Sequence, residues 1–351
     1  MIKPQNILIV RTDRIGDVIL TLPMADVIKK HYPDAEITFM LRDYTLPLAE
    51  NNDCIDKTIS LIEEDGKIPF FKNLKKISGG NFDTCIVVNP SFQVALMLFL
   101  SGIKLRVGTG YRWYSLLFNK KVYEHRKYGK THELELNVNL LKQLNIFEHI
   151  DKENVKFNIH IDEEADKKVD EYLSSLNIDK AKSMFIVHPG SGGSAMDLPI
   201  KQYKKLIQWI NENLNVNVLL TGSEQEKNIC EELRLNENIF NTAGEFNLKE
   251  LTALINRSDL FISNSTGPLH IAAALDVHTI GFYPKIAACS PNRWGPYSLK
   301  SKVFTPEIEC ANCTREQCER LDCMSNINIK SVFEYTEKIY KFIINNGENN
   351  A

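Results

Sequence analysis

A short stretch of charged residues follows the first strand-like run of the chain and could carry out acid–base chemistry. Residues 11–17 read RTDRIGD, with Gly16 at a turn and Asp17 at the start of a predicted helix. Gly16 allows a tight turn or a close approach of the backbone to a ligand. Asp17 either caps that helix, or is simply favoured by the positive helix end, or acts as a general base. As a base it would take a proton from a hydroxyl nucleophile, while Arg11 or Arg14 compensates negative charge.

A loop rich in glycine and serine follows another strand-like run and could hold phosphate groups. It begins at His188 and continues through Gly190, Ser191 and Gly192. The backbone N–H groups of such a loop can line a small concavity that binds a diphosphate. The alternative is a plain flexible loop. The spacing matches neither a Walker A loop nor a G-x-G-x-x-G fingerprint.

A third stretch, residues 263–270, again runs from a strand into a helix. Pro268 suits the first helical turn, and Thr266 or Gly267 suits the N-cap. The helix start would then point amides and hydroxyls at an anionic group, or it is only a well-capped structural helix with His270 in the core. A fourth turn of this kind, at Gly222 and Ser223, follows another strand-like run. Taken together, these stretches predict the following ligands of a nucleotide donor: Arg14, Gly16, His188, Gly190, Ser191, Gly192, Gly222, Ser223, Asn264, Ser265, Thr266, Gly267 and His270.

The elements that must position these residues read as two α/β halves. Near-continuous apolar runs alternate with helical patterns, which is typical of parallel sheets covered by helices on both faces. The predicted strands are residues 7–11, 36–41, 84–88 and 105–108 in the first half, and 184–187, 216–220, 260–263 and 279–282 in the second. Predicted helices include 17–31, 92–100, 133–144, 163–176, 200–214, 224–233, 248–256, 268–275 and 329–345.

The domain boundaries follow from an acidic hinge near residue 161. We expect an N-terminal acceptor-binding domain over residues 1–160, a nucleotide-sugar-binding domain over 161–325, and a C-terminal helix with a frayed tail over 326–351. Two doubly wound domains predict a binding cleft at the carboxyl ends of their strands.

Composition excludes several classes of protein. The chain has 351 residues, with 42 Lys and Arg against 45 Asp and Glu, so its formal net charge is −3. Hydrophobic residues make up 43%, which is ordinary for a globular protein and not for a disordered one. The near-neutral charge argues against a surface that coats nucleic acid. The N-terminus has no secretory pattern and the longest apolar run, residues 94–100, is too short to span a bilayer, so we expect a cytoplasmic protein.

The net charge hides one strongly basic segment. Residues 104–130 contain eight Lys or Arg and one acid, Glu124, with aromatic residues between them. This is either a solvated basic face or a surface that docks an anionic glycolipid or an anionic membrane, with peripheral contact at the inner membrane. No nucleic-acid-binding motif accompanies it. The candidate acceptor-binding residues are Arg112, Lys120, Lys121, Arg126 and Lys130.

Four of the eight cysteines lie close together near the end of the second half. Cys310, Cys313, Cys318 and Cys323 could form a structural zinc site, because one C-x2-C pair and four thiolates suit tetrahedral zinc. The longer second spacing favours free or packing thiols instead.

In its three strand-to-helix loops the sequence resembles the heptosyltransferases of glycosyltransferase family 9. The similarity covers nearly the whole chain and is carried by residues 16–18, 21–23, 188–190 and 265–274. It implies an α/β GT-B fold, in which two doubly wound Rossmann-like domains face each other across a cleft. It also implies an inverting glycosyltransferase that needs no cofactor and moves a heptose or related sugar from ADP-heptose, or another nucleotide sugar, to the lipopolysaccharide core or a similar glycolipid. In such a protein Asp17 is the catalytic base, and residues 265–270 bind the nucleotide diphosphate.

Three positions depart from the pattern of that family. Met196 stands where the family usually has a phosphate-binding Lys and Leu198 where it has a Trp, while many members have Asp in place of Ser265. Charge compensation would then come from Arg14, the loop amides and the helix start, or from Lys201. A nucleotide-sugar epimerase or hydrolase of the same architecture, and a non-catalytic sugar-nucleotide-binding protein, remain the alternatives.

Overall fold

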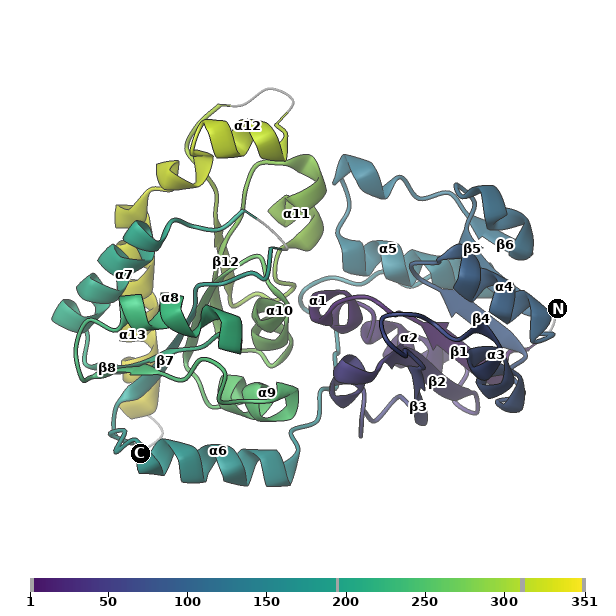
Figure 1. Ribbon diagram of the computed structural model, residues 1–351, viewed down its shortest axis with the longest axis horizontal. Helices are drawn as coiled ribbons and strands as arrows, with labels where there is room; N and C mark the ends of the chain where they lie inside the picture. The colour runs from purple at the N-terminus through teal and green to yellow at the C-terminus, as the bar shows by residue number, and fades with distance from the viewer. Residues whose placement is uncertain (1–2, 194–195, 310–312, 349–351) are drawn as a thin grey trace. The chain divides into compact units, whose positions relative to one another are not determined.

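The computed structural model describes residues 3–193, 196–309 and 313–348. The chain divides into two compact units, one made of Met1–Arg126 with Thr131–His160 and the other of Lys127–Lys130 with Ile161–Ala351. Each unit contains one six-stranded sheet in which all neighbouring strands are parallel. The predicted α/β class with two doubly wound sheets is confirmed (Figure 1).

The sheet of the first unit reverses its strand order at the centre. Its order is β3-β2-β1-β4-β5-β6, so the chain builds outward from β1 in one direction and then in the other. Ligands of such sheets bind beside this reversal, at the carboxyl ends of the strands. The strands are β1 (Asn6–Val10), β2 (Glu36–Arg42), β3 (Lys57–Leu61), β4 (Thr84–Val87), β5 (Leu105–Thr109) and β6 (Lys120–Val122).

Helices and short 3-10 turns connect these strands. They are α1 (Ile15–Ile19), α2 (Pro23–His31), η1 (Asp43–Leu48), α3 (Phe70–Gly79), α4 (Phe92–Leu100), η2 (Trp113–Leu117), η3 (Arg126–Tyr128), α5 (Glu133–Asn139) and η4 (Leu140–Leu144). The single helix predicted for residues 17–31 is wrong, because the chain breaks between α1 and α2. Pro23 has no N–H to continue the helical ladder, and the hydroxyl of Thr21 donates to the Asp17 carbonyl at 2.7 Å.

The second unit repeats the architecture with strand order β12-β11-β10-β7-β8-β9. Its strands are β7 (Ser183–His188), β8 (Val216–Leu220), β9 (Ile239–Asn241), β10 (Leu260–Asn264), β11 (His278–Phe282) and β12 (Ser301–Phe304). Its helices and 3-10 turns are α6 (Glu163–Ser175), α7 (Ile200–Asn213), η5 (Glu224–Glu226), α8 (Lys227–Leu233), α9 (Leu248–Asn256), α10 (Gly267–Ala274), η6 (Ala287–Cys289), α11 (Pro291–Trp294), α12 (Arg315–Arg320), η7 (Cys323–Asn326) and α13 (Ile329–Glu348).

Both faces of this second sheet are covered. Phe185 and Val218 belong to the core that also contains residues of α7 and α13, which pack against each other. The next residues along these strands, Ile186 and Leu219, have side chains on the opposite face of the sheet and are fully buried as well. The terminal helix α13 is therefore part of the second unit's core. In the part of the chain that the structure describes, no helix is long and apolar enough to cross a membrane.

Candidate active site

The loop after β1 contains a buried arginine with three acidic neighbours. Arg11 is only 2% exposed, and its Nη2 atom donates a hydrogen bond to Oδ1 of Asp17. The same guanidinium lies 3.3 Å from Oδ2 of Asp13 and 3.6 Å from Oε1 of Glu133. Burial alone would lower the pKa of Arg11, but these carboxylates, Asp17 above all, raise it above its ordinary value. Arg11 is therefore a permanent buried cation that holds Asp17 in place.

Asp17 lies in the first turn of α1 and does not cap it. The N-cap is Arg14, an exposed residue, so the expectation of a capping role for Asp17 is wrong. Its carboxylate turns back to Arg11 because an ion pair with a buried cation is stronger than one amide contact. Burial raises the pKa of Asp17 above its ordinary value, while Arg11 opposes this rise. Of the two carboxylate oxygens of Asp17, Oδ1 accepts the hydrogen bond from Arg11.

Loops from three adjacent strands meet around this pair. Asn89, after β4, donates from Nδ2 to Oδ2 of Asp13 at 2.8 Å. Tyr44, after β2, donates from its hydroxyl to the Asp13 carbonyl at 3.1 Å. The group therefore lies where the strand order reverses, which is the expected ligand position of a doubly wound sheet.

Glu133, the third acidic neighbour of Arg11, is itself held by further hydrogen bonds. Glu133 also accepts a hydrogen bond from Arg126, and Arg126 donates to Oδ1 of Asn137 at 3.0 Å. Asn137 in turn donates to the Leu20 carbonyl at 2.9 Å. Arg126, predicted from the basic segment as an acceptor ligand, is thus engaged inside the first unit.

In the second unit the three predicted loops follow neighbouring strands, because β10, β7 and β8 are adjacent in the sheet. Asn264 ties two of these loops together. Its Oδ1 accepts from the Leu198 amide at 2.8 Å and its Nδ2 donates to the Pro189 carbonyl at 2.6 Å. Asn264 is fully buried, and with both polar ends engaged it fixes the loop after β7 to the end of β10.

His188 is buried beneath the glycine loop. Its Nδ1 lies 3.0 Å from the hydroxyl of Thr221, and its ring stacks on Phe261. Burial lowers the pKa of His188 to about 4, against a smaller opposing effect of Glu226. The imidazole is therefore neutral near pH 7 and supplies no positive charge to a phosphate.

Glu226 fills the space below the glycine loop and was missed in the sequence. A Cβ placed on Gly190 would lie 1.7 Å from Oε1 of Glu226. Oε2 accepts from the backbone N–H of Ser223 at 2.7 Å and from its hydroxyl at 2.9 Å. Burial raises the pKa of Glu226, but the hydrogen bonds from Ser223 outweigh it and the pKa lies below its ordinary value. The capping-box spacing of Ser223 and Glu226 was the available signal.

The start of α10 is capped as predicted. Thr266 is the N-cap and accepts from the Leu269 amide at 3.4 Å, and Pro268 lies in the first turn. His270 is buried within α10. Ser265 shares a hydrogen bond with Tyr283. Gly222, at the end of β8, lies against the side chain of Glu226.

The remaining predicted positions near the donor loops differ in exposure. Leu198 is buried in the core of the second unit, and Met196 packs against that core. Ser191 hydrogen-bonds Asp197, whose pKa burial raises above its ordinary value. Gly192 adopts a left-handed backbone, with φ of 54°, which explains why glycine stands there.

Four basic side chains of the predicted acceptor surface, Arg112, Lys120, Lys121 and Lys130, are exposed. None of them forms an ion pair with another described residue.

The cysteine cluster is only partly described. Sγ of Cys313 lies 3.2 Å from Sγ of Cys318, and Cys323 is buried beside them. Cys310 lies outside the described residues. Within the described ranges no three His, Cys, Asp or Glu side chains are arranged to hold a metal ion.

Comparison with known proteins gives one family. The family model described as glycosyltransferase family 9 (heptosyltransferase) matches residues 70–323. A Haemophilus influenzae protein provisionally named a glycosyltransferase is 29% identical over 314 residues, covering 86% of this chain and 89% of that protein. The lipopolysaccharide core heptosyltransferase OpsX of the same organism is 25% identical over 319 residues, covering 86% and 84%.

A solved structure has the same fold. The Escherichia coli ADP-heptose lipopolysaccharide heptosyltransferase II matches with a TM-score of 0.76 at 20% identity, covering 96% of this chain and 98% of that one. At that identity the likeness concerns the fold, and both six-stranded sheets take part in it.

Proposed function

Because the chain belongs to glycosyltransferase family 9 and has the GT-B fold, we propose that it transfers a heptose or related sugar from a nucleotide sugar to a glycolipid. ADP-heptose is the expected donor, and the lipopolysaccharide core the expected acceptor, because the similar proteins carry these names. The reaction inverts the anomeric carbon and takes place on the cytoplasmic side.

The observation that carries this proposal is the buried ion pair of Arg11 and Asp17. A general base must stay ionised yet be basic enough to accept a proton. Burial makes the Asp17 carboxylate more basic, and Arg11 keeps it ionised and oriented. Oδ2 of Asp17 takes the proton of the acceptor hydroxyl as the hydroxyl oxygen bonds to the anomeric carbon.

The second unit receives the leaving diphosphate in this proposal. As the new bond forms, the bond between the anomeric carbon and the diphosphate oxygen breaks, and negative charge develops on the phosphate. The amides of residues 188–193 and 264–267 and the N-terminus of α10 stabilise that charge. Arg14, an exposed cation of the first unit, is the candidate for a charged partner. Since His188 is neutral, these dipoles take the place of a cationic side chain.

The acceptor is held by the first unit. Arg112, Lys120 and Lys121 are exposed on this unit and suit the phosphates and acidic sugars of a glycolipid core. Lys130 is exposed as well but belongs to the short segment that groups with the second unit. Arg126 is not part of this set, because Glu133 and Asn137 engage it.

A donor screen followed by product analysis tests the proposal. Thermal unfolding is measured with ADP-heptose and with UDP-, GDP- and other ADP-sugars, since a ligand of the native state raises the melting temperature with its affinity. The preferred donor is then incubated with and without a deacylated lipopolysaccharide core. Transfer that needs the acceptor supports the proposal. Consumption of donor without acceptor indicates a hydrolase or epimerase, and binding without any turnover indicates a sugar-nucleotide-binding protein.

A further inference from the structure

The outer face of α4 is apolar although it is exposed. The helix reads FQVALMLFL and contains no charged residue. Val94, Ala95, Met97 and Leu98 pack into the core of the first unit. The opposite side carries Phe92, Leu96, Phe99 and Leu100, spaced three or four residues apart, and of these only Leu96 is partly buried. Helices whose outer side faces water normally carry charged or polar residues there.

The 3-10 helix η2 extends this apolar face. Trp113 is 73% exposed and Leu116 71% exposed, and residues three apart on a 3-10 helix point to the same side. The rings of Phe92 and Trp113 lie 4.7 Å apart, which joins η2 to α4. Tyr114 fixes the turn, since its hydroxyl donates to the Pro90 carbonyl at 2.5 Å. We call Phe92, Leu96, Phe99, Leu100, Trp113 and Leu116 the α4–η2 face.

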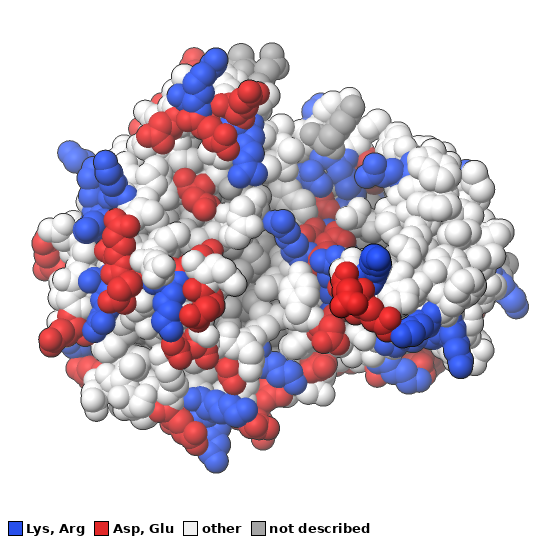
Figure 2. Space-filling model, in the orientation of Figure 1, with Lys and Arg blue, Asp and Glu red and all other residues white. Residues whose placement is uncertain are grey.

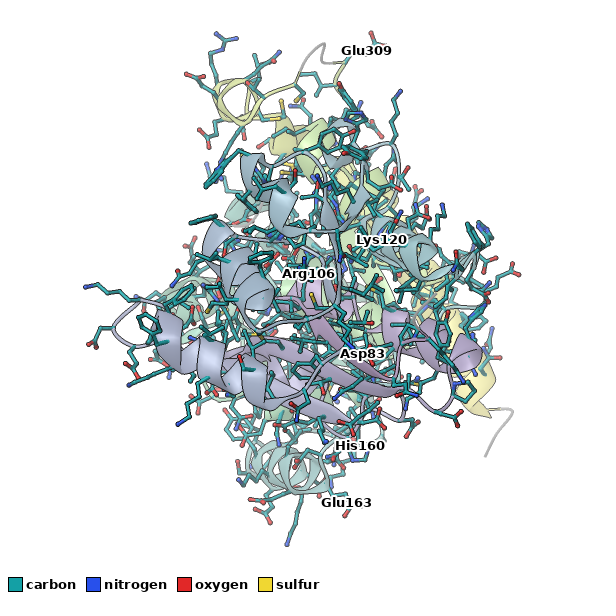
Figure 3. All side chains as sticks on the ribbon, turned by 90° about the vertical axis from the view of Figure 1, so that its right-hand side faces the viewer. Asp83, Arg106, Lys120, His160, Glu163 and Glu309 are labelled. Carbon is teal, nitrogen blue, oxygen red and sulfur yellow. The ribbon has the colours of Figure 1, made fainter. Side chains whose placement is uncertain are left out.

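The charged residues of the segment that builds the α4–η2 face are all basic. Residues 84–123 contain five Lys or Arg and no Asp or Glu, in a chain with 45 acidic residues. The guanidinium of Arg106 lies 5.1 Å from the Phe99 ring centre. Arg106 and Lys120 lie on the side of the unit turned toward the viewer in Figure 3. The surface over α4 is largely white in Figure 2, which agrees with the absence of charged residues from that helix.

We propose that the α4–η2 face inserts into the interface of an anionic lipid bilayer. Trp, Phe and Leu side chains on one side of a helix, with Lys and Arg beside them, are the composition of segments that lie in a membrane surface. Cations beside such a surface are attracted to anionic headgroups. A second copy of this chain fits less well, because a symmetric contact would bring the basic residues of the two copies, such as Arg106 and Arg112, toward one another.

The inference goes beyond the proposed reaction and does not depend on it. A protein that holds its first unit on a bilayer would meet a lipid-anchored molecule along the surface, whatever chemistry follows. Binding to vesicles is therefore measured without any donor or acceptor, so its outcome is separate from that of the transfer assay.

Vesicle sedimentation with the full chain tests the proposal. Vesicles of phosphatidylcholine with phosphatidylglycerol are compared with phosphatidylcholine alone, at low and at raised sodium chloride. We expect binding to the anionic vesicles, weakened by salt, and a loss of about tenfold or more when Trp113→Ser and Leu116→Ser are combined. Leu299→Ser, at a residue that is 67% exposed in the second unit, is the matched control and should bind like the unaltered protein.

A variant of Trp113 distinguishes insertion of its side chain into the bilayer from a purely electrostatic contact with the headgroups. Trp113→Phe keeps an aromatic side chain, so it should still bind, but the blue shift of tryptophan emission on adding anionic vesicles should disappear. Protein that stays in the supernatant, or a double variant that binds as well as the unaltered chain, overturns the proposal. A dimer in gel filtration that the double variant converts to monomer overturns it too, in favour of a contact between copies.

Discussion

Arg11 donates a hydrogen bond from Nη2 to Oδ1 of Asp17, so the end of β1 and the first turn of α1 are joined by an ion pair inside the first unit. Arg11 is almost inaccessible to water, whereas the Asp17 side chain keeps 19% of its surface exposed. One partner therefore belongs to the core and the other reaches the surface where substrate arrives. The buried guanidinium of Arg11 can therefore fix the position of the partly exposed Asp17 carboxylate.

The first prediction concerns the role of Asp17 as base. Asp17→Asn keeps the shape of the side chain but removes its basic oxygen, so transfer should fall by about 100-fold to 10,000-fold. The Kd of the donor should stay within about twofold of the unaltered value, because the variant changes no donor ligand. Single-turnover rates and calorimetry measure the two quantities. Asp13→Asn is the matched control, since Asp13 also faces Arg11, and should cost far less. Turnover at the unaltered rate in Asp17→Asn removes it from the mechanism.

The second prediction separates orientation by Arg11 from simple stabilisation of the fold. Arg11 lowers the pKa of Asp17, and burial raises it. In Arg11→Gln the pKa of Asp17 should therefore rise further, so a higher pH is needed to ionise the base. The acid side of the profile of kcat/KM should move to higher pH, and activity should be lost more at about pH 6 than at about pH 8. An equal loss at every pH, with an unmoved profile, contradicts this.

The strands that sequence patterns predicted are the eight interior ones, and the four missed are the edges of the two sheets. Interior strands such as β1 and β10 are buried along their length and read as apolar runs. The edge strand β6 consists of Lys120, Lys121 and Val122, and its exposed side needs no apolar residue. Edge strands are kept short and charged, which removes the pattern by which a strand is recognised.

The loops of the site were found from glycine and hydroxyl residues, but the side-chain contacts inside them were not. Thr266 as the helix cap follows from local chemistry. The side chain of Asn264, in contrast, uses both its polar ends on Pro189 and Leu198, in a single connection that lies more than sixty residues earlier in the sequence. The contact of Arg11 with Glu133 joins residues more than a hundred positions apart. Such contacts depend on tertiary packing and leave no local spacing to detect.

The third prediction is that metal removal leaves transfer unchanged. In the proposed reaction Asp17 takes the proton, and loop amides with the start of α10 stabilise the diphosphate, so no step needs a Lewis acid. Dialysis against EDTA should keep kcat/KM within about twofold, and added magnesium should not raise it. A large loss that magnesium or zinc restores contradicts the mechanism. Metal analysis of the same samples shows whether the cysteine segment retains an ion.

The fourth prediction links His188 to the pH dependence of stability. The folded pKa, about 4, lies below the ordinary 6.5, so the unfolded chain binds a proton that the folded chain refuses. Stability from the neutral imidazole is complete above pH 6.5 and is lost as the pH falls toward 4. A shift of this size corresponds to about 3 kcal/mol of unfolding free energy.

Urea unfolding at several pH values measures this effect. His188→Gln cannot be protonated, so its free energy of unfolding should fall less steeply in this pH range than that of the unaltered protein. His149→Gln, at an exposed histidine, is the control and should keep the unaltered slope. Parallel curves for His188→Gln and the unaltered protein contradict the assignment.

The last prediction tests whether Glu226 is what requires glycine at position 190. A Cβ on Gly190 would lie 1.7 Å from Oε1 of Glu226, whose other oxygen is held by Ser223. Gly190→Ala should therefore push the Glu226 carboxyl aside and break its hydrogen bonds with Ser223, which costs about 1 kcal/mol of unfolding free energy. In a Glu226→Ala background the space is open, so the same substitution should cost much less, and the two changes should not be additive. Gly79→Ala, where a Cβ meets nothing within 4 Å, is the control and should not destabilise. Equal costs of Gly190→Ala in both backgrounds would mean that the loop backbone, and not Glu226, sets the requirement.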